Sequence, residues 1–116
     1  MSSTTFRPAT AEEAEALGLR LTGWLWVIED SDGIAAHGGV VLNGAFQAIF
    51  HMEDRARNYP RTLAKALTTV RKKIGEVGCV YALEDPEQET AYRLLKWFGF
   101  VPIGLVGQQV LYKWIG

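Results

Sequence analysis

The sequence has little of what marks a secreted or membrane-spanning protein. Its one cysteine, Cys79, cannot form a disulfide within the chain, so no oxidising compartment is indicated. The first ten residues, MSSTTFRPAT, lack the apolar stretch of a signal peptide. The strongest apolar run, WLWVI at 24–28, is too short to span a bilayer. We therefore expect a cytoplasmic protein that makes no contact with a membrane.

Neither sign of charge dominates the chain as a whole. It has 116 residues, a formal net charge of −1 and 48% hydrophobic residues, which is typical of one folded domain covering 1–116. Basic side chains are instead concentrated at 54–73, where the acidic residue is Asp54 and the basic ones are Arg55, Arg57, Arg61, Lys65, Arg71, Lys72 and Lys73. Such a segment can attract phosphate groups, and a solvated helix face is the alternative.

The N-terminal half predicts strands with one short helix among them. Residues 4–8 can form a strand, and Thr10 with Glu13 makes the capping box that begins a helix. A strand is expected from 24 to 29, then the turn DSDG at 30–33 and a second strand over 34–42.

Asn43-Gly44 is the dipeptide typical of a type I′ hairpin turn, because both central residues of that turn need positive φ. It predicts a third strand over 45–53, with Leu42 opposite Ala45. Both faces of this strand pair are largely apolar, so we expect helices above and below the sheet. The same register places His37 and His51 on opposite faces, which argues against a shared metal site.

The C-terminal half predicts two helices and three strands. Leu63, Leu67, Val70, Ile74 and Val77 recur with helical spacing over 60–77, and CVYAL at 79–83 is a short buried strand. Asp85-Pro86 starts a second helix, which Gly99 ends, and 101–106 with 108–115 form a final hairpin. The fold class is α/β (α+β), with a mixed, mostly antiparallel sheet in the order β-α-β-β-β-α-β-α-β-β and helices on both faces.

The end of the second long helix, AYRLLKWFGFVPI at 91–103, carries the most specific pattern. Its spacing is that of N-x-x-A-x-x-L-Y-x-x-x-G-F, and the corresponding residues here are Gln88, Ala91, Leu94, Leu95, Gly99 and Phe100. Together with the element order, this pattern resembles the GNAT superfamily of acyl-CoA N-acyltransferases over nearly the whole chain. That family transfers an acyl group from acetyl-CoA to an amine.

The resemblance implies where acetyl-CoA would bind. Its acyl arm would lie where two neighbouring strands splay apart, and its diphosphate at the N-terminus of the helix after the meander. The implied cofactor-binding residues are Phe50, His51, Met52, Arg55, Asn58, Tyr59, Arg61 and Gln88. Glu53 stands where the family often has its base, and Tyr92 is a substitute for the acid that protonates the leaving thiolate.

Two positions depart from the family pattern. The diphosphate loop usually reads R/Q-x-x-G-x-G/A, whereas this chain has R-x-x-N-x-P, with Asn58 and Pro60 in place of the glycines. Proline has no N–H to donate to a phosphate, and Asn58 adds a side chain where the backbone should approach closely. Leu95 occupies the place where the family commonly has a tyrosine, and leucine cannot transfer a proton.

Two functions of different classes follow from this pattern. One is a pseudoenzyme with a degenerate acetyl-CoA site that acts as a binding or structural module. The other is an active acetyl-CoA-dependent N-acetyltransferase. The compact length, the altered loop and Gly38-Gly39 are also similar to the small GNAT-like internal virion proteins of short-tailed phages, which implies a protein or virion partner and a location in the virion or host cytoplasm. Nucleic-acid binding is disfavoured, because no aromatic residues interleave with the basic segment.

Overall fold

The computed structural model describes residues 4–18, 23–84 and 89–116. The elements follow the predicted order with one added 3-10 segment: β1 (Thr5–Pro8), α1 (Ala11–Ala16), β2 (Gly23–Asp30), β3 (Gly33–Asn43), β4 (Ala45–Met52), η1 (Asp54–Asn58), α2 (Pro60–Val77), β5 (Tyr81–Glu84), α3 (Glu89–Phe98), β6 (Phe100–Val106) and β7 (Gln109–Trp114). The predicted helix start at Asp85-Pro86 lies outside the described residues. No described helix has the length and apolar character needed to cross a membrane.

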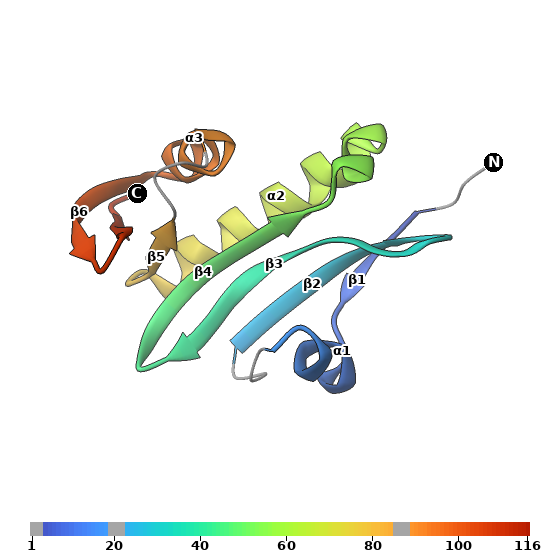
Figure 1. Ribbon diagram of the computed structural model, residues 1–116, viewed down its shortest axis with the longest axis horizontal. Helices are drawn as coiled ribbons and strands as arrows, with labels where there is room; N and C mark the ends of the chain where they lie inside the picture. Colours follow the sequence, from blue (N-terminus) through green and yellow to red (C-terminus); the bar gives the residue numbers. More distant parts are fainter. Residues whose placement is uncertain (1–3, 19–22, 85–88) are drawn as a thin grey trace.

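The described strands form one sheet in the order β1-β2-β3-β4-β5-β7-β6. The β4–β5 pair is parallel and the other pairs are antiparallel. This arrangement confirms the mixed, mostly antiparallel sheet. Helices α2 and α3 lie on one side of the sheet and α1 lies on the other, so helices occupy both faces as predicted (Figure 1).

Local signals in the sequence determine where the helices begin and end. The predicted capping box is present, since the backbone N–H of Glu13 donates to the Thr10 hydroxyl (3.1 Å) and that of Thr10 donates to the Glu13 carboxylate (3.0 Å). Helix α2 has Pro60 in its first turn, where a missing N–H costs nothing. It passes through Gly75 and ends at Gly78, whose φ of 86° is one that other residues rarely adopt.

The hairpin between β3 and β4 differs from the prediction by one residue. Leu42 lies opposite Phe46, and Asn43 opposite Ala45, so Gly44 alone makes the turn. Gly44 has a φ of 75°, and no described residue other than glycine has positive φ, so the predicted type I′ turn at Asn43-Gly44 is wrong. A shift of one residue moves every side chain of a strand to the other face.

The two histidines therefore share a face. His37 lies opposite His51 in the ladder, and their imidazole rings stack with centroids 5.4 Å apart. The prediction of opposite faces was wrong because it rested on the type I′ register. Among the described residues, no group of three His, Cys, Asp or Glu side chains is placed to hold a metal ion.

The core lies between the sheet and the α2–α3 layer. Its larger cluster joins Val70 and Ile74 of α2, Leu95 and Phe98 of α3, and strand residues, which are Val40, Val80, Ala82, Phe100 and Tyr112. A smaller cluster joins the start of α2 and η1 to β2 and β3, through Ile28, Ala35, Ala36, Ala56 and Ala66. Burying these apolar side chains holds α2 and α3 against the same face of the sheet, over its centre.

Candidate functional site

The centre of the sheet opens where β4 and β5 meet. These two parallel strands share one described ladder pair, Gln47 with Tyr81. Beyond that pair β4 continues to Met52 and β5 to Glu84 without further pairing between described residues. The two strands therefore splay apart, and their backbone edges leave a gap that side chains or a ligand can occupy.

A cavity of about 360 Å³ fills this gap, within the usual range of small-molecule sites, about 300–1,000 Å³. Six consecutive residues of β4, Gln47–Met52, form one wall, and Ala82, Leu83 and Glu84 of β5 form the other. Leu94, Leu95 and Phe98 of α3 and Val70 of α2 close it on the helical side, and Asp54 and Arg57 of η1 lie at one end. The interior is thus mainly apolar, with charged groups at its end.

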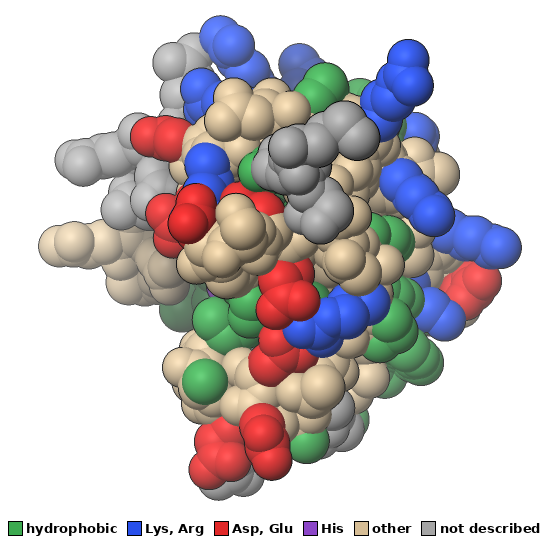
Figure 2. All heavy atoms as spheres, turned by 90° about the vertical axis from the view of Figure 1, so that its right-hand side faces the viewer, with side chains coloured by type: hydrophobic (Ala, Val, Ile, Leu, Met, Phe, Trp, Pro, Cys, Tyr) green, Lys and Arg blue, Asp and Glu red, His purple; other side chains and the backbone are tan. Residues whose placement is uncertain are grey.

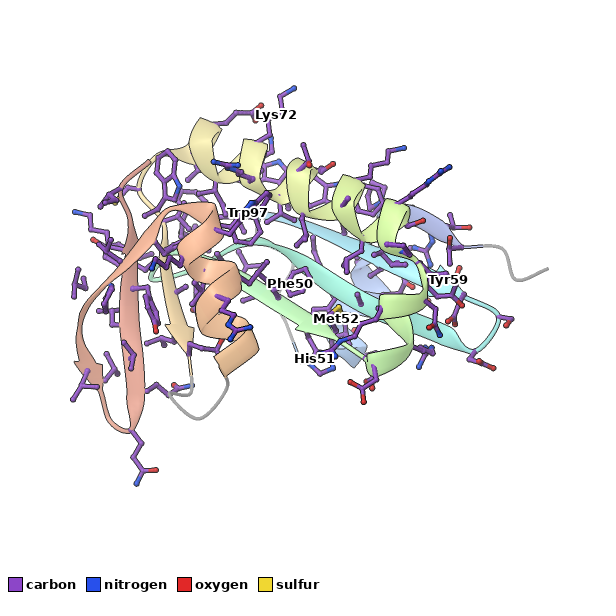
Figure 3. The ribbon with its side chains drawn as sticks, turned by 90° about the horizontal axis from the view of Figure 1, so that it is seen from above. Phe50, His51, Met52, Tyr59, Lys72 and Trp97 are labelled. Carbon is purple, nitrogen blue, oxygen red and sulfur yellow. The ribbon has the colours of Figure 1, made fainter. Side chains whose placement is uncertain are left out.

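The cavity reaches both faces of the sheet. Successive residues of a strand point to opposite faces, so a wall made of consecutive β4 residues is the edge of that strand. Phe50 and Met52 belong to the face that packs on α2, and Ile49 and His51 belong to the other. Figure 3 shows Phe50, His51 and Met52 in a row between α3 and the η1 segment. A chain-like ligand and a second molecule could therefore meet there from opposite sides.

Three titratable side chains gather on the face away from α2. His51, which lines the cavity, lies 3.3 Å from Glu53 (Nε2 to Oε1), and its ring stacks on His37. Burial lowers the pKa of His37 below its ordinary value, and the charge of His51 lowers it further. His51 and Glu53 are both more than half exposed, so they can reach a molecule that approaches the cavity from this face.

Arg55 and Tyr59 are both bound to the carboxylate of Asp30, at the β2–β3 turn and beside the end of β4. Arg55 donates to Asp30 (Nε to Oδ2, 2.9 Å) and to the carbonyl oxygen of Ile34 (2.9 Å), and the Tyr59 hydroxyl donates to Asp30 at 3.2 Å. Burial alone would raise the pKa of Asp30, but the hydrogen bonds from Arg55, from the backbone of Asp32 and from Tyr59 lower it overall. These two residues therefore hold η1 against the β2–β3 turn, and neither lines the cavity.

The other residues of the expected diphosphate loop are exposed. Asn58 ends η1, and Arg61 lies in the first turn of α2 beside Pro60. No side chain caps the N-terminus of α2. Arg57, which sequence reasoning left out of the site, lines the cavity. On the end of the molecule seen in Figure 2, basic side chains gather mostly on the upper, α2 side, and acidic ones mostly lower, toward α1.

Among the described residues, no side chain that could protonate the leaving thiolate stands at the position expected for the general acid. Leu95 is buried in the core and lines the cavity, so an apolar group stands where the family commonly has a tyrosine. Tyr92 lies in α3, but its side chain is outside the described part of the chain, as is the whole of Gln88. Sequence reasoning did not assign Ala48, Leu94 and Phe98 to the site, although they line the cavity. Their apolar spacing indicated that they are buried. It could not indicate which two strands splay apart beside them.

Comparison with solved structures identifies the fold. A protein described as an acyl-CoA N-acyltransferase, from Klebsiella pneumoniae, superposes with a TM-score of 0.68 at 16% identity over 96% of each chain. The ribosomal-protein-S18-alanine N-acetyltransferase of Escherichia coli superposes with a TM-score of 0.67 at 8% identity, over 97% of this chain and 93% of that one. A GNAT-family acetyltransferase from Desulfovibrio desulfuricans gives 0.62 at 13% identity, over 96% and 98%.

This chain therefore has the GNAT acyltransferase fold, and the fold resemblance expected from the sequence is confirmed. No protein-family model matches the sequence, and no curated protein matches it.

Proposed function

We propose that this chain is a GNAT-fold binding module that accepts an acyl-pantetheine arm in the β4–β5 cavity but no longer grips the diphosphate of acetyl-CoA or transfers the acyl group. One observation carries the proposal. The cavity between the splayed strands is open and apolar, whereas the loop at its end offers Pro60 at the helix start and an Arg55 that Asp30 already holds.

Pro60 removes one hydrogen bond that the start of α2 could otherwise donate to the diphosphate. A hydrogen bond to a charged group contributes about 1.5–3 kcal/mol, and Pro60 has no N–H with which to make one. The missing donor alone would weaken acetyl-CoA binding by roughly ten- to a hundredfold. Arg57 and Arg61 lie close enough in the chain to offset part of this loss, but exposed side-chain cations give up rotamer freedom to bind an anion.

The chemistry at the sulfur is weakened independently. A thiolate leaving group needs a proton, and Leu95, buried beside the cavity, has none to give. Two separate parts of the family's machinery are therefore altered in one chain. A binding or structural role toward another protein, including a virion assembly, is compatible with both changes.

A second function is favoured by one specific contact. His51 lines the cavity and pairs with Glu53 on the face from which an amine acceptor would approach. A histidine beside a carboxylate can remove a proton from an attacking amine. If the leaving thiolate is protonated by water, the chain would be an active acetyl-CoA-dependent N-acetyltransferase.

Titration calorimetry with two ligands distinguishes the parts of the proposal. Acetyl-CoA carries the diphosphate and S-acetylpantetheine does not, so a chain that grips the arm alone should bind both with affinities within about threefold of each other. Replacing Ala48, a β4 residue of the cavity wall, by leucine should weaken both by at least tenfold. Ala64→Leu makes the same change at an exposed position of α2 and should alter neither affinity.

The outcomes separate the two functions. Release of free thiol from acetyl-CoA in the presence of a panel of amines, lost in His51→Gln, would establish the transferase and overturn the binding module. Acetyl-CoA bound more than a hundredfold tighter than S-acetylpantetheine would show that the diphosphate site works. If neither ligand binds, the acyl-pantetheine arm is not the occupant of the cavity.

A further inference from the structure

The two edges of the sheet differ in how they are protected. A strand at an edge presents unpaired backbone N–H and C=O groups to any other strand, and native proteins usually shorten, charge or cover such an edge. In this chain β1 forms one edge and β6 forms the other. The same molecule thus offers a protected edge against which the second can be judged.

The β1 edge carries the usual protection. It has four residues, and its last, Pro8, has no N–H to donate. Arg7 pairs with Glu13 of α1 (Nη1 to Oε1, 2.7 Å) and with Glu29 of β2 (Nη2 to Oε2, 3.4 Å). Adding a strand here would bury these charges, so this edge disfavours further pairing.

The β6 edge carries no charged residue, and its proline, Pro102, and its irregular register, between Pro102 and Gly104, interrupt only its first half. It is seven residues long, and its apolar side chains face solvent: Ile103 is 51% exposed, Leu105 74% and Val106 50%. The whole stretch from 100 to 112, which covers β6 and most of β7, contains no Lys, Arg, Asp or Glu. An exposed apolar edge without charge is a template for another strand.

The exposed side chains of β6 point to both faces of the sheet, which favours a strand added at the edge over a protein docked on one face. Leu105 lies opposite Val110 and Val106 lies opposite Gln109, so the two are neighbours along one strand and point to opposite faces of the sheet. A protein that docks on one face would cover only one of them. A strand paired along β6 places side chains on both faces and covers both.

We propose that the occupant of this edge is the β6 strand of a second copy of the chain, paired antiparallel about a two-fold axis. In such a pairing each residue meets a residue of the same segment, and a segment without charge meets no like charge in any register. The net charge of −1 adds little long-range repulsion between copies. Pro102 is tolerated at an edge, and the irregular register between Pro102 and Gly104 leaves the outer half, Gly104–Val106, as the centre of pairing.

The position of β6 makes this pairing accessible. The chain measures 44 × 27 × 26 Å, and β6 lies at one end of the longest axis, away from the β2–β3 turn (Figure 1). The two sheets would join end to end into one continuous sheet. The cavity between β4 and β5 lies inward of β7, so the dimer leaves it open.

Sedimentation equilibrium from 1 to 200 µM, with small-angle scattering at the highest concentration, tests the proposal. The unaltered chain should form an elongated dimer. Leu105→Lys should raise the dimer dissociation constant at least tenfold, and because Leu105 is mostly exposed, its melting temperature as a dilute monomer should not change. Thr5→Lys places the same charge on an exposed residue of the β1 edge and should leave the dimer intact.

Three results would overturn the proposal. A chain that stays monomeric up to 200 µM has no self-pairing edge. A dimer that Leu105→Lys leaves unchanged uses another surface. Open, growing oligomers that Thr5→Lys also disperses would indicate head-to-tail pairing of β1 with β6 in place of the two-fold dimer.

Discussion

The imidazole rings of His37 and His51 stack across β3 and β4, with their centroids 5.4 Å apart, on the face of the sheet away from α2. The charge of His51 makes a positive charge on His37 less favourable. The more buried ring, His37, carries the consequence, since burial and the neighbouring charge both lower its pKa. The pair thus couples the charge of the candidate base, His51, to a residue inside the sheet.

The stability of the protein should therefore fall on the acid side. Unfolding returns His37 to its ordinary pKa of 6.5. Below that pH the unfolded state therefore binds more protons than the folded state, and protonation favours unfolding. We expect the melting temperature to drop between pH 7 and 5.5, and His37→Gln to make that drop smaller. Imidazole titration by NMR should place the pKa of His37 below 6.5 in the unaltered protein, and a value of 6.5 or above would contradict this account.

Replacing His51 separates the two causes. His51→Gln removes the neighbouring charge but leaves His37 partly buried, and burial is the larger cause. The pKa of His37 should rise in this variant and still remain below 6.5. A full return to the ordinary value would mean that the stacked partner, and not burial, dominates.

Arg55, through its ion pair with Asp30, should contribute more to stability than any other arginine of the η1–α2 segment. The Asp30 side chain is 1% exposed, so removing Arg55 leaves a buried carboxylate that only Tyr59 and the Asp32 backbone still contact. Arg55→Ala should lower the melting temperature by roughly 10 °C. Arg61→Ala, at an exposed position, should lower it by less than about 2 °C.

The same pair gives the Arg55 variant a distinct pH dependence. Because the pKa of Asp30 is lowered on folding, its contribution is present above the ordinary value of 3.8 and is lost as pH falls through the folded value. The difference in melting temperature between Arg55→Ala and the unaltered protein should therefore shrink in acid. An equal difference at pH 3 and pH 7 would show that Arg55 acts through packing alone.

The sequence contained the element order but not the register of its central hairpin. Helical spacing, the capping box at Thr10 and the glycine at 78 each act within a few residues, and each predicted its element correctly. The register of β3 on β4 had no such local determinant, because both faces of these strands are apolar and either alignment buries similar side chains. The dipeptide Asn43-Gly44 favoured the alignment that the structure does not have.

The site shows the same division between local and long-range information. Phe50, His51 and Met52 were implied by the family resemblance as cofactor-binding residues, and in the structure they line the cavity. Arg55 was expected to face an anion and instead pairs with Asp30, 25 residues earlier in the chain. Nothing in the spacing of a single sequence indicates which of several arginines a distant carboxylate will bind, so only the folded arrangement distinguishes Arg55 from Arg57.

Adjacent glycines in β3 should respond differently to the same small change. A Cβ on Gly39 would overlap the carbonyl oxygen of Trp24 and come within 2.9 Å of the Leu25 Cα, and these backbone atoms cannot move without breaking the β2–β3 ladder. A Cβ on Gly38 would meet the Phe50 ring at 2.7 Å, and a side chain can rotate away. Gly39→Ala should lower the melting temperature by at least about 5 °C or prevent folding.

Gly38→Ala should fold and act on the cavity instead. Displacing Phe50 changes the cavity wall, so binding of S-acetylpantetheine should weaken several-fold while the melting temperature falls by less than in Gly39→Ala. Thermal melting and calorimetry on the two variants make the comparison. If Gly38→Ala were the more destabilised of the two, the assignment of Phe50 to the cavity side of the strand would have to be reconsidered.

Restoring the diphosphate loop should tighten acetyl-CoA binding without affecting the arm. Pro60→Ala returns one backbone N–H to the start of α2, and adding Asn58→Gly removes the side chain from the approach. The double variant should bind acetyl-CoA at least roughly tenfold tighter than the unaltered chain, since one donor to a charged group is worth about 1.5–3 kcal/mol. S-acetylpantetheine, which has no diphosphate, should bind both proteins equally. A gain for both ligands would indicate a reshaped cavity, and no gain for either would mean that the N-terminus of α2 does not face the diphosphate of a ligand in the β4–β5 gap.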